Sequence, residues 1–487
     1  MAEQSGTPAR TESHDPDFPE AFLQFMRSGW GDEPLAVSPL AEVPNYAKRR
    51  AAVSDAFAGE TLIIPSGNEK VRSNDTDYPF RPGSDFFYLT GDRDPDSVLV
   101  LRPTASGHDA VVYTHERNSK ETDAFFRSRN GELWIGRTHT LGEKSTELGL
   151  ETAPLGALGG ALAQAAPGRT RVLRGLDPNV DRAVLAYEPD RQKPRDRELA
   201  WVISELKLIK DEWEIAQLQA AIDATVHGFE DVARVLPADR SVKERLLEGV
   251  FGLRARHDGN DVGYSSIVGA GAHATILHWV RNTGMITPGD LLLMDMGVEG
   301  HNLYTADVTR TVPVSGTFNP LQRRIYDIVY ASQQAGMDAI RPGVKFRDIH
   351  KTCMRVLAEG LHDLGLLPVS VDEAMDDEST VYRRWTLHGF GHMLGIDVHD
   401  CANARNENYR DGTLAEGYVL TVEPGLYFQA EDELVPAELR GVGVRIEDDV
   451  LVTADGCRNL SAGLPRSSAE VEAWLAAQRE AGPRLPE

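Results

Sequence analysis

The stretch DLLLMDMGVEGHNLYTADVTRTVPV, residues 290–314, contains two strand-like segments that each carry an acidic residue. The apolar run LLLM is typical of a strand buried on both faces, and Asp295 follows it directly. After a glycine-containing turn, Asp307 shares one face with Thr309 and Thr311 by period-two alternation. An antiparallel hairpin would bring the two aspartates together, and a cation would offset the cost of burying them side by side. Alternatively, one aspartate caps a turn and the other faces water.

The same pattern of an apolar strand next to a carboxylate recurs in VLTVEPGLYF (419–428) and GVGVRIEDDVLV (441–452). Glu423 follows the apolar run of the first segment. In the second segment, alternation places Arg445 and Glu447 on one face. An ion pair on a surface edge strand would explain Glu447 alone, but it does not explain the repetition of the pattern.

Three histidines lie close together in LHGFGHMLGIDVHD (387–400), namely His388, His392 and His399. The interspersed glycines argue against a stable helix, and the HExxH motif of one zinc-peptidase class is absent. One isolated histidine would most often be structural. Three of them in a glycine-rich segment favour a site.

Four carboxylates and one imidazole form an oxygen-rich ligand set without a thiolate, which favours Mn²⁺ or a related divalent ion over structural zinc. Four carboxylates carry enough charge for two ions, which could activate a shared water and polarise a carbonyl, as hydrolases do. The ligand types leave the number of ions open. The carboxylates are those of Asp295, Asp307, Glu423 and Glu447, and the imidazole is that of one of the three histidines in 387–400.

Size and composition describe a globular protein of two or three domains, since 487 residues exceed one ordinary core. A formal charge of −24 disfavours nucleic acid as a partner, because phosphate binding relies on clustered basic residues. No apolar run approaches the roughly 20 residues of a membrane span, and the polar N-terminus lacks the regions of a signal peptide. The three widely spaced cysteines imply no disulfide framework, so we expect a cytoplasmic protein.

Along the chain, residues 1–40 read as a tail or arm, and a mixed α/β region follows. Its strand-like runs are 61–64, 97–101 and 110–113, and the charged, proline-containing stretch 187–198 reads as a loop or linker.

Helical patterns dominate the region after this stretch. Apolar spacing predicts a helix over 211–236. Ser241 and Glu244 match a capping box at the start of the next helix. Further helices are expected after an N-cap at Asn319 and over 346–364.

Several strings of the sequence are similar to those of a known family. The strings DMG…ADVTRT, HGFGHMLGIDVHD, VLTVEPGLY and GVGVRIEDD resemble the pita-bread metallopeptidases over about residues 205–460, and most closely the Xaa-Pro aminopeptidases (aminopeptidase P). RSNDTDYPFRPGSDFFYLTG (72–91) looks like the N-terminal domain of that family. The implied fold is of the α/β (α+β) class, with an aminopeptidase P-like mixed α/β domain over 41–205 and a pita-bread catalytic domain over 206–487.

The resemblance also implies a mechanism. The implied metal ligands are Asp295, Asp307, His392, Glu423 and Glu447. They would bind two divalent ions, typically manganese, with Asp307 and Glu447 bridging them. A metal-bound hydroxide would attack the carbonyl before proline, and Glu423 would help to move its proton. Arg445 would orient Glu447 or Asp307.

Further residues are implied to surround the substrate. Three of them, His278, His388 and His399, would line the pocket and hydrogen-bond the scissile carbonyl or the developing oxyanion. The implied substrate-binding residues are Tyr264, Tyr427 and Phe87. At Phe87 a phenylalanine stands where the resemblance suggests a tryptophan, which keeps an aromatic wall but loses an indole N–H.

The expected partners are peptides with proline at the second position, and not nucleic acid or a membrane. A homodimer or homotetramer is expected as well. Prolidase, which cleaves only Xaa-Pro dipeptides, shares the fold and the ligands and remains an alternative. A non-catalytic pita-bread binding module is another, although all five ligand positions here can coordinate. Methionine aminopeptidase shares the ligands, but it is typically shorter and lacks the large N-terminal domain.

Overall fold

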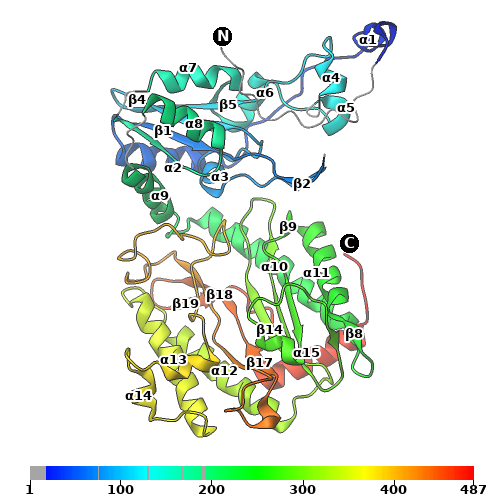
Figure 1. The fold of residues 1–487 in the computed structure, drawn as a ribbon, viewed down its shortest axis with the longest axis vertical. Coiled ribbons are helices and arrows are strands. Elements are labelled where there is room, and N and C mark those ends of the chain that lie inside the picture. Colours follow the sequence, from blue (N-terminus) through cyan, green and yellow to red (C-terminus); the bar gives the residue numbers. More distant parts are fainter. Residues whose placement is uncertain (1–17, 75, 129–130, 166–167, 189–192, 487) are drawn as a thin grey trace. The chain divides into compact units, whose positions relative to one another are not determined.

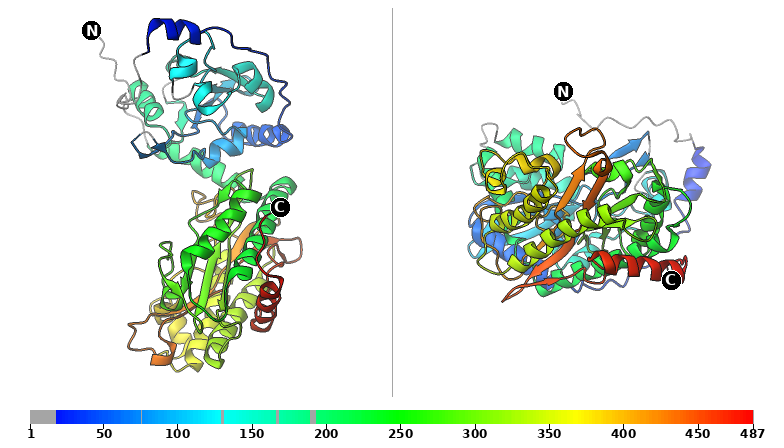
Figure 2. Two further views of the ribbon diagram at one scale, coloured as in Figure 1. Left: turned by 90° about the vertical axis from the view of Figure 1, so that its right-hand side faces the viewer. Right: turned by 90° about the horizontal axis from the view of Figure 1, so that it is seen from below.

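The computed structural model describes residues 18–486, apart from residues 75, 129–130, 166–167 and 189–192. The chain divides into two compact units, Met1–Ile203 and Ser204–Glu487. Both units combine helices with strands (Figures 1 and 2), so the predicted mixed α/β class is confirmed. Within the described residues, no helix is both long and apolar enough to cross a membrane.

The N-terminal unit is built on a mixed five-stranded sheet in the order β6-β5-β4-β1-β7. β4 runs antiparallel to β1 and β5, whereas β7 is parallel to β1 and β6 is parallel to β5. The three predicted strand runs correspond to β1, β4 and β5. The strands of the sheet are β1 (Thr61–Pro65), β4 (Val98–Thr104), β5 (Gly107–Thr114), β6 (Glu151–Pro154) and β7 (Thr170–Val172).

Helices and a small hairpin complete this unit. Apolar side chains of α7 and α8 pack into one cluster with residues of the sheet, including Ile63 and Val100. The hairpin consists of β2 (Val71–Ser73) and β3 (Thr76–Asp77). The helices are α1 (Glu20–Met26), α2 (Val43–Ala56), α3 (Ser84–Thr90), α4 (Ala124–Arg127), α5 (Glu132–Ile135), α6 (Leu141–Leu148), α7 (Leu158–Ala163), α8 (Pro178–Tyr187) and the short 3₁₀ helix η1 (Leu155–Ala157).

The loop predicted over 187–198 is wrong in its second half. Helix α9 (Lys193–Leu206) begins there, and residues 189–192 lie outside the described residues. Pro194 lies in the first turn of α9, where a missing N–H breaks no helical hydrogen bond, so this proline starts a helix and does not interrupt one.

Short strands in the C-terminal unit pair into several small sheets. The central one has the order β10-β12-β14, and a second has the order β15-β18-β19. Two-stranded pairs join β16 to β17, β8 to β11 and β9 to β13. The strands are β8 (Val242–Lys243), β9 (Asp261–Val262), β10 (Ile267–Ala270), β11 (Met285–Ile286), β12 (Leu291–Met296), β13 (Val298–Glu299), β14 (Val308–Pro313), β15 (Val419–Val422), β16 (Gly425–Phe428), β17 (Val442–Arg445), β18 (Asp448–Val452) and β19 (Cys457–Asn459).

Four helices predicted for this unit are confirmed as α10 (Glu212–Val235), α11 (Glu244–Asp258), α12 (Pro320–Ala339) and α13 (Phe346–Asp363). The side chain of Asn319 accepts hydrogen bonds from the first turn of α12, as its N-cap position predicts. The last helix, α15, lies against α10 (Figures 1 and 2). The remaining helices are α14 (Val371–Met375), α15 (Ser468–Ala481), and the 3₁₀ helices η2 (Gly271–Thr275), η3 (Val381–Trp385) and η4 (Ala437–Leu439).

The capping box predicted at Ser241 and Glu244 is wrong. Residues 242–243 form strand β8, and Lys243 is the N-cap of α11 without a side-chain cap. Glu244 is fully buried and accepts hydrogen bonds from a different segment. Tertiary partners therefore outcompete the local cap.

Candidate metal centre

The hairpin predicted for residues 290–314 is confirmed. β12 and β14 pair antiparallel with Asp295 opposite Thr309, and Asp307 lies directly before β14. The hydroxyl of Tyr264 lies 2.7 Å from Oδ1 of Asp295 and 2.5 Å from Oδ1 of Asp307. Asp295 is 8% exposed and Asp307 is 5% exposed, so neither faces bulk water.

Glu447 joins the hairpin from the far end of the chain. The strand predicted over 441–452 is split: β17 pairs with β16, β18 pairs with β15, and Glu447 between them forms a bridge to Thr309. Oγ1 of Thr309 donates to Oε2 of Glu447 at 2.7 Å. Because Glu447 is only 2% exposed, the alternative of a surface ion pair is wrong.

Arg445 lies on the same side as Glu447, as alternation predicts, but its direct partner differs from the expected one. Its Nη2 forms an ion pair with Oδ2 of Asp295, and its Nη1 donates to the hydroxyl of Tyr427 at 3.0 Å. We expected it to orient Glu447 or Asp307. A pair of hydrogen bonds connects Arg445 to Glu447 through Thr309, whose Oγ1 accepts from Nε at 3.1 Å.

The histidine-rich segment is not helical, as its glycines predict. Nε2 of His392 lies 3.3 Å from Oδ2 of Asp307 and 3.6 Å from Oε1 of Glu423. The segment lies against β15 so closely that a Cβ at Gly391 would come 2.0 Å from the carbonyl oxygen of Thr421. Only glycine lets the backbone approach in this way.

Ligand atoms of Asp307, His392 and Glu447 all lie within 4.8 Å of one another. Asp295 adjoins this group through the shared Tyr264 hydroxyl, and Glu423 adjoins it through His392. The tertiary structure therefore brings all five predicted ligands to one place.

The electrostatics of the cluster indicate a cation. Burial raises the pKa of Asp295, an effect that Arg445 opposes and Asp307 reinforces. Burial likewise raises the pKa of Glu423 to about 7 and that of Glu447 well above its usual range. Buried carboxylates this close together bind protons, unless a bound cation takes the place of those protons. The donor set therefore fits hard divalent ions.

A cavity of about 820 Å³ opens at this cluster. Its wall also includes apolar side chains such as Leu277 and Val280. The predicted site residues that line it are Tyr264, His278, Asp295, Asp307, His388, His392, His399, Glu423, Arg445 and Glu447.

Tyr427 contacts His388, one of the residues that line the cavity. Its hydroxyl lies 2.7 Å from Nε2 of His388, whose Nδ1 lies 3.5 Å from Oε2 of Glu423. Burial and the charge of Arg445 lower the pKa of His388 to about 3, so the imidazole is neutral. The ring of His399 lies 4.3 Å from that of His392.

Phe87 belongs to the N-terminal unit. It is buried on α3, where its ring contacts Tyr46 edge-on at 6.2 Å. Its predicted contact with substrate stays a prediction.

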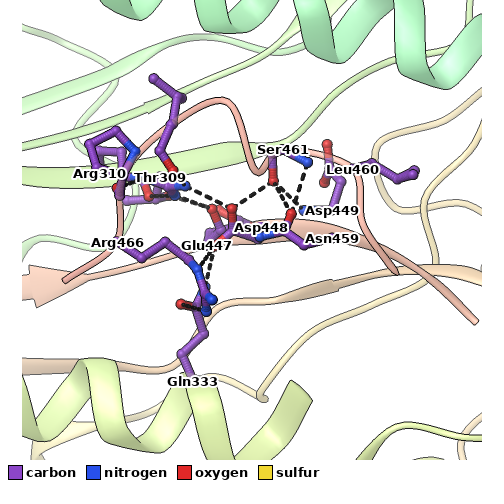
Figure 3. A network of polar contacts seen from close by, with 12 residues as sticks. Thr309, Arg310, Gln333, Glu447, Asp448, Asp449, Asn459, Leu460, Ser461 and Arg466 are labelled. Atoms are coloured by element: carbon purple, nitrogen blue, oxygen red, sulfur yellow. Dashed lines mark hydrogen bonds and ion pairs between the residues drawn. The ribbon is translucent and has the colours of Figure 1, made fainter. Parts of the chain in front are cut away.

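Polar contacts behind Glu447 hold its backbone in place (Figure 3). The buried guanidinium of Arg310 donates to the carbonyl oxygen of Glu447 at 2.6 Å and pairs with Oδ1 of Asp448 at 2.7 Å. Oδ2 of Asp448 accepts from Gln333 at 2.8 Å, and Oδ1 accepts from Ser461 at 2.7 Å. Such outer contacts orient metal ligands.

Sequence reasoning missed Thr309 and Asp449. Thr309 links Glu447 to Arg445, and its place on the face of Asp307 was a usable signal, because a buried hydroxyl needs partners. Oδ2 of Asp449 accepts from the backbone N–H of Asp307 at 3.0 Å. No local pattern distinguishes Asp449 from the preceding aspartate.

Fold and site agree with one class of enzyme. The model of metallopeptidase family M24 matches residues 216–454, and the model of the aminopeptidase P N-terminal domain matches residues 46–173. This chain is similar to the Xaa-Pro aminopeptidase 1 of Streptomyces coelicolor, with 53% identity covering 95% of this chain and 93% of the relative. The Xaa-Pro aminopeptidase of Escherichia coli is 34% identical, covering 89% and 97%.

Solved structures agree. Aminopeptidase P from Escherichia coli with the inhibitor Pro-Leu matches with a TM-score of 0.80 and 31% identity, covering 91% of this chain and all of that one. The zinc-substituted form of that enzyme in complex with product is 32% identical over the same share, also with a TM-score of 0.80. The chain belongs to the Xaa-Pro aminopeptidases, a metal-dependent exopeptidase family, and these relatives favour the aminopeptidase over prolidase.

Proposed function

We propose that this protein releases the N-terminal residue from peptides with proline at the second position, in a metal-dependent reaction. The observation that carries the proposal is the group of Asp307, His392 and Glu447, which converges within 4.8 Å beside the cavity. The identity of 53% to a Xaa-Pro aminopeptidase supplies the substrate class.

Asp295, Asp307, His392, Glu423 and Glu447 would hold two divalent ions, and Mn²⁺ is our choice for both. Asp307 and Glu447 would be central members of this ligand set, since they belong to the group that converges within 4.8 Å. When bound, the ions would supply an activated water and a Lewis acid for the scissile carbonyl.

The protein's own groups would bind the peptide and move protons. His278, His388 and His399 line the cavity, where their imidazoles can hydrogen-bond the carbonyl before proline and the oxyanion that develops from it. Glu423 lies between two histidines, 3.5 Å from His388 and 3.6 Å from His392, and would accept and return the proton of the attacking water.

Neighbouring groups would keep these side chains in place. Arg445 holds Asp295 and Tyr427, while Tyr264 holds the two aspartates of the hairpin. Tyr264, Tyr427 and Phe87 are our substrate-binding candidates. Tyr264 lines the cavity itself.

We further propose a cytoplasmic homodimer or homotetramer that acts on peptides and not on nucleic acid or a membrane. The net charge of −24 supports the exclusion of nucleic acid, and the three unpaired cysteines support a cytoplasmic location.

A paired peptide assay tests the function. Purified protein loaded with Mn²⁺ should release arginine from Arg-Pro-Pro-Gly. Cleavage of Gly-Pro alone would identify a prolidase, and a protein that neither binds nor is activated by a divalent metal would be a binding module. Metal analysis of the same sample distinguishes these outcomes.

A further inference from the structure

The loop that carries His278 has little regular structure of its own. It connects β10 to β11 and contains only the 3₁₀ helix η2 before an irregular stretch over 276–284. An irregular loop positions a catalytic imidazole only if other groups restrain it. The restraint comes from one buried carboxylate.

Glu244, the first residue of α11, is fully buried and accepts four hydrogen bonds, one from the last residue of β10 and three from this loop. Its Oε1 accepts from the backbone N–H of Ala270 at 3.1 Å and lies 2.8 Å from Nδ1 of His273. Its Oε2 accepts from Nε1 of Trp279 at 2.7 Å and from the backbone N–H of Gly284 at 2.6 Å. These donors come from the start, the middle and the end of the loop.

Those four donors match the capacity of the acceptor. A carboxylate offers about four acceptor positions and no donor, so both oxygens of Glu244 are saturated. Hydrogen bonds to a charged acceptor inside a protein are about twice as strong as neutral ones. A glutamine at position 244 would replace one of these oxygens by an NH₂ group, which would then face two hydrogen-bond donors of the protein.

Packing tightens the same arrangement. The rings of His273 and Trp279 stack at 3.8 Å with an interplanar angle of 24°, and the guanidinium of Arg281 lies 4.6 Å from the Trp279 ring. A Cβ at Gly284 would come 2.5 Å from the His273 ring and 2.7 Å from Oε1 of Glu244. The loop therefore closes around the carboxylate without room for a side chain.

We propose that Glu244 is a positioning residue for His278, an inference that rests on the proposed function. Trp279 directly follows His278, so the bond from Nε1 to Glu244 fixes the backbone on one side of the imidazole. Glu244 is not among the described residues that line the cavity, so we infer that it acts without contacting the substrate. Its effect on the reaction passes through His278, and a displacement of about 1 Å at such a group can cost roughly 100-fold in rate.

A double-mutant cycle tests the inference. Glu244→Gln should lower kcat for Arg-Pro-Pro-Gly by about 10- to 100-fold with a smaller change in KM, and it should leave the bound Mn²⁺ unchanged. In a His278→Ala background, the same substitution should lower kcat by less than about twofold, because the group that it positions is gone. A structural role alone would lower the rate by the same factor in both backgrounds.

A milder variant and a matched control complete the design. Trp279→Phe keeps the ring and removes only the Nε1 donor, so it should show the same non-additivity with a smaller effect if Glu244→Gln fails to fold. Glu248→Gln, one turn further along α11 and outside the cavity wall, should leave kcat unchanged.

Equal losses in both backgrounds would overturn the inference, and so would an active wild type whose Glu244→Gln variant keeps its full rate. If the wild type loaded with Mn²⁺ cleaves neither Arg-Pro-Pro-Gly nor Gly-Pro, the proposed function fails, and the inference fails with it.

Discussion

Thr309 holds Glu447 from two sides. Its hydroxyl donates to Oε2 of Glu447 at 2.7 Å, and its carbonyl oxygen accepts from the backbone N–H of Glu447 at 3.1 Å. The same hydroxyl accepts from Nε of Arg445. One buried side chain thus connects Glu447, a proposed metal ligand, to Arg445, whose guanidinium pairs with the proposed ligand Asp295.

Replacing Thr309 by valine should weaken metal binding. Valine keeps the shape and suits a strand, but it removes the hydroxyl that orients Glu447, and loss of such a contact typically costs about 10- to 100-fold in metal affinity. Titration calorimetry with Mn²⁺ measures the effect. Thr311→Val is the control, because the hydroxyl of Thr311 forms its hydrogen bonds within the described residues with the backbone of Arg445 and not with a carboxylate. Equal affinities of Thr309→Val and wild type would contradict the role of Thr309.

Removal of a central member of the proposed ligand set should abolish activity. Asp307→Ala and Glu447→Ala each delete a member of the group that converges within 4.8 Å. Peptidase assays with metal analysis of each variant provide the check. Near-normal turnover by Glu447→Ala would show that the ligand assignment is wrong.

Tyr427→Phe should retain substantial activity. The variant loses the hydroxyl that lies between His388 and Arg445, a hydrogen bond worth about 1 kcal/mol, so a fall in kcat of roughly five- to tenfold is expected. Complete inactivation of a folded variant would assign this hydroxyl a direct part in the reaction.

Metal removal should lower thermal stability. The buried carboxylates of Asp295, Asp307 and Glu447 repel one another, and an ion that binds only the folded state adds about 2.7 kcal/mol at 100 times its Kd. Calorimetry should therefore show a higher Tm with Mn²⁺ than after dialysis against a chelator. Identical transitions would argue against a metal at this cluster.

Low pH should reduce the stabilisation that a second buried ion cluster, Asp400 with Lys207 and Lys210, gives to this unit. Burial alone would raise the pKa of Asp400, but Lys207 at 3.2 Å and Lys210 at 3.1 Å outweigh it and lower the pKa to about 2. The folded pKa is below the ordinary value of 3.8, so this stabilisation is present above about pH 4 and is lost as the pH falls toward 2.

Asp400→Asn tests this cluster, because it removes the buried carboxylate that pairs with both lysines. The variant should lose about 3–5 kcal/mol of unfolding free energy near pH 7, measured with urea. Its deficit relative to wild type should begin to shrink below pH 4. A deficit that stays constant down to pH 3 would contradict the depressed pKa.

Local patterns in the chain were enough to predict much of the fold. The apolar run before Asp295 and the alternation after Asp307 predicted the hairpin, because side-chain period and burial are properties of neighbouring residues. The N-cap at Asn319 predicted the start of α12 for the same reason. The ligand types followed from carboxylates next to apolar strands.

Contacts between distant segments decided the rest. Local sequence patterns could not show that Glu244 hydrogen-bonds a distant loop in place of a capping box, or that Arg445 pairs with Asp295. Both choices depend on which segments become neighbours, and hydrogen-bond partners inside a core are selected by burial and geometry. The local chemistry of the chain therefore predicts the types of metal ligand, and only the tertiary structure places Asp307, His392 and Glu447 within 4.8 Å of one another. Segments distant in sequence must bury their apolar faces together before these side chains can meet.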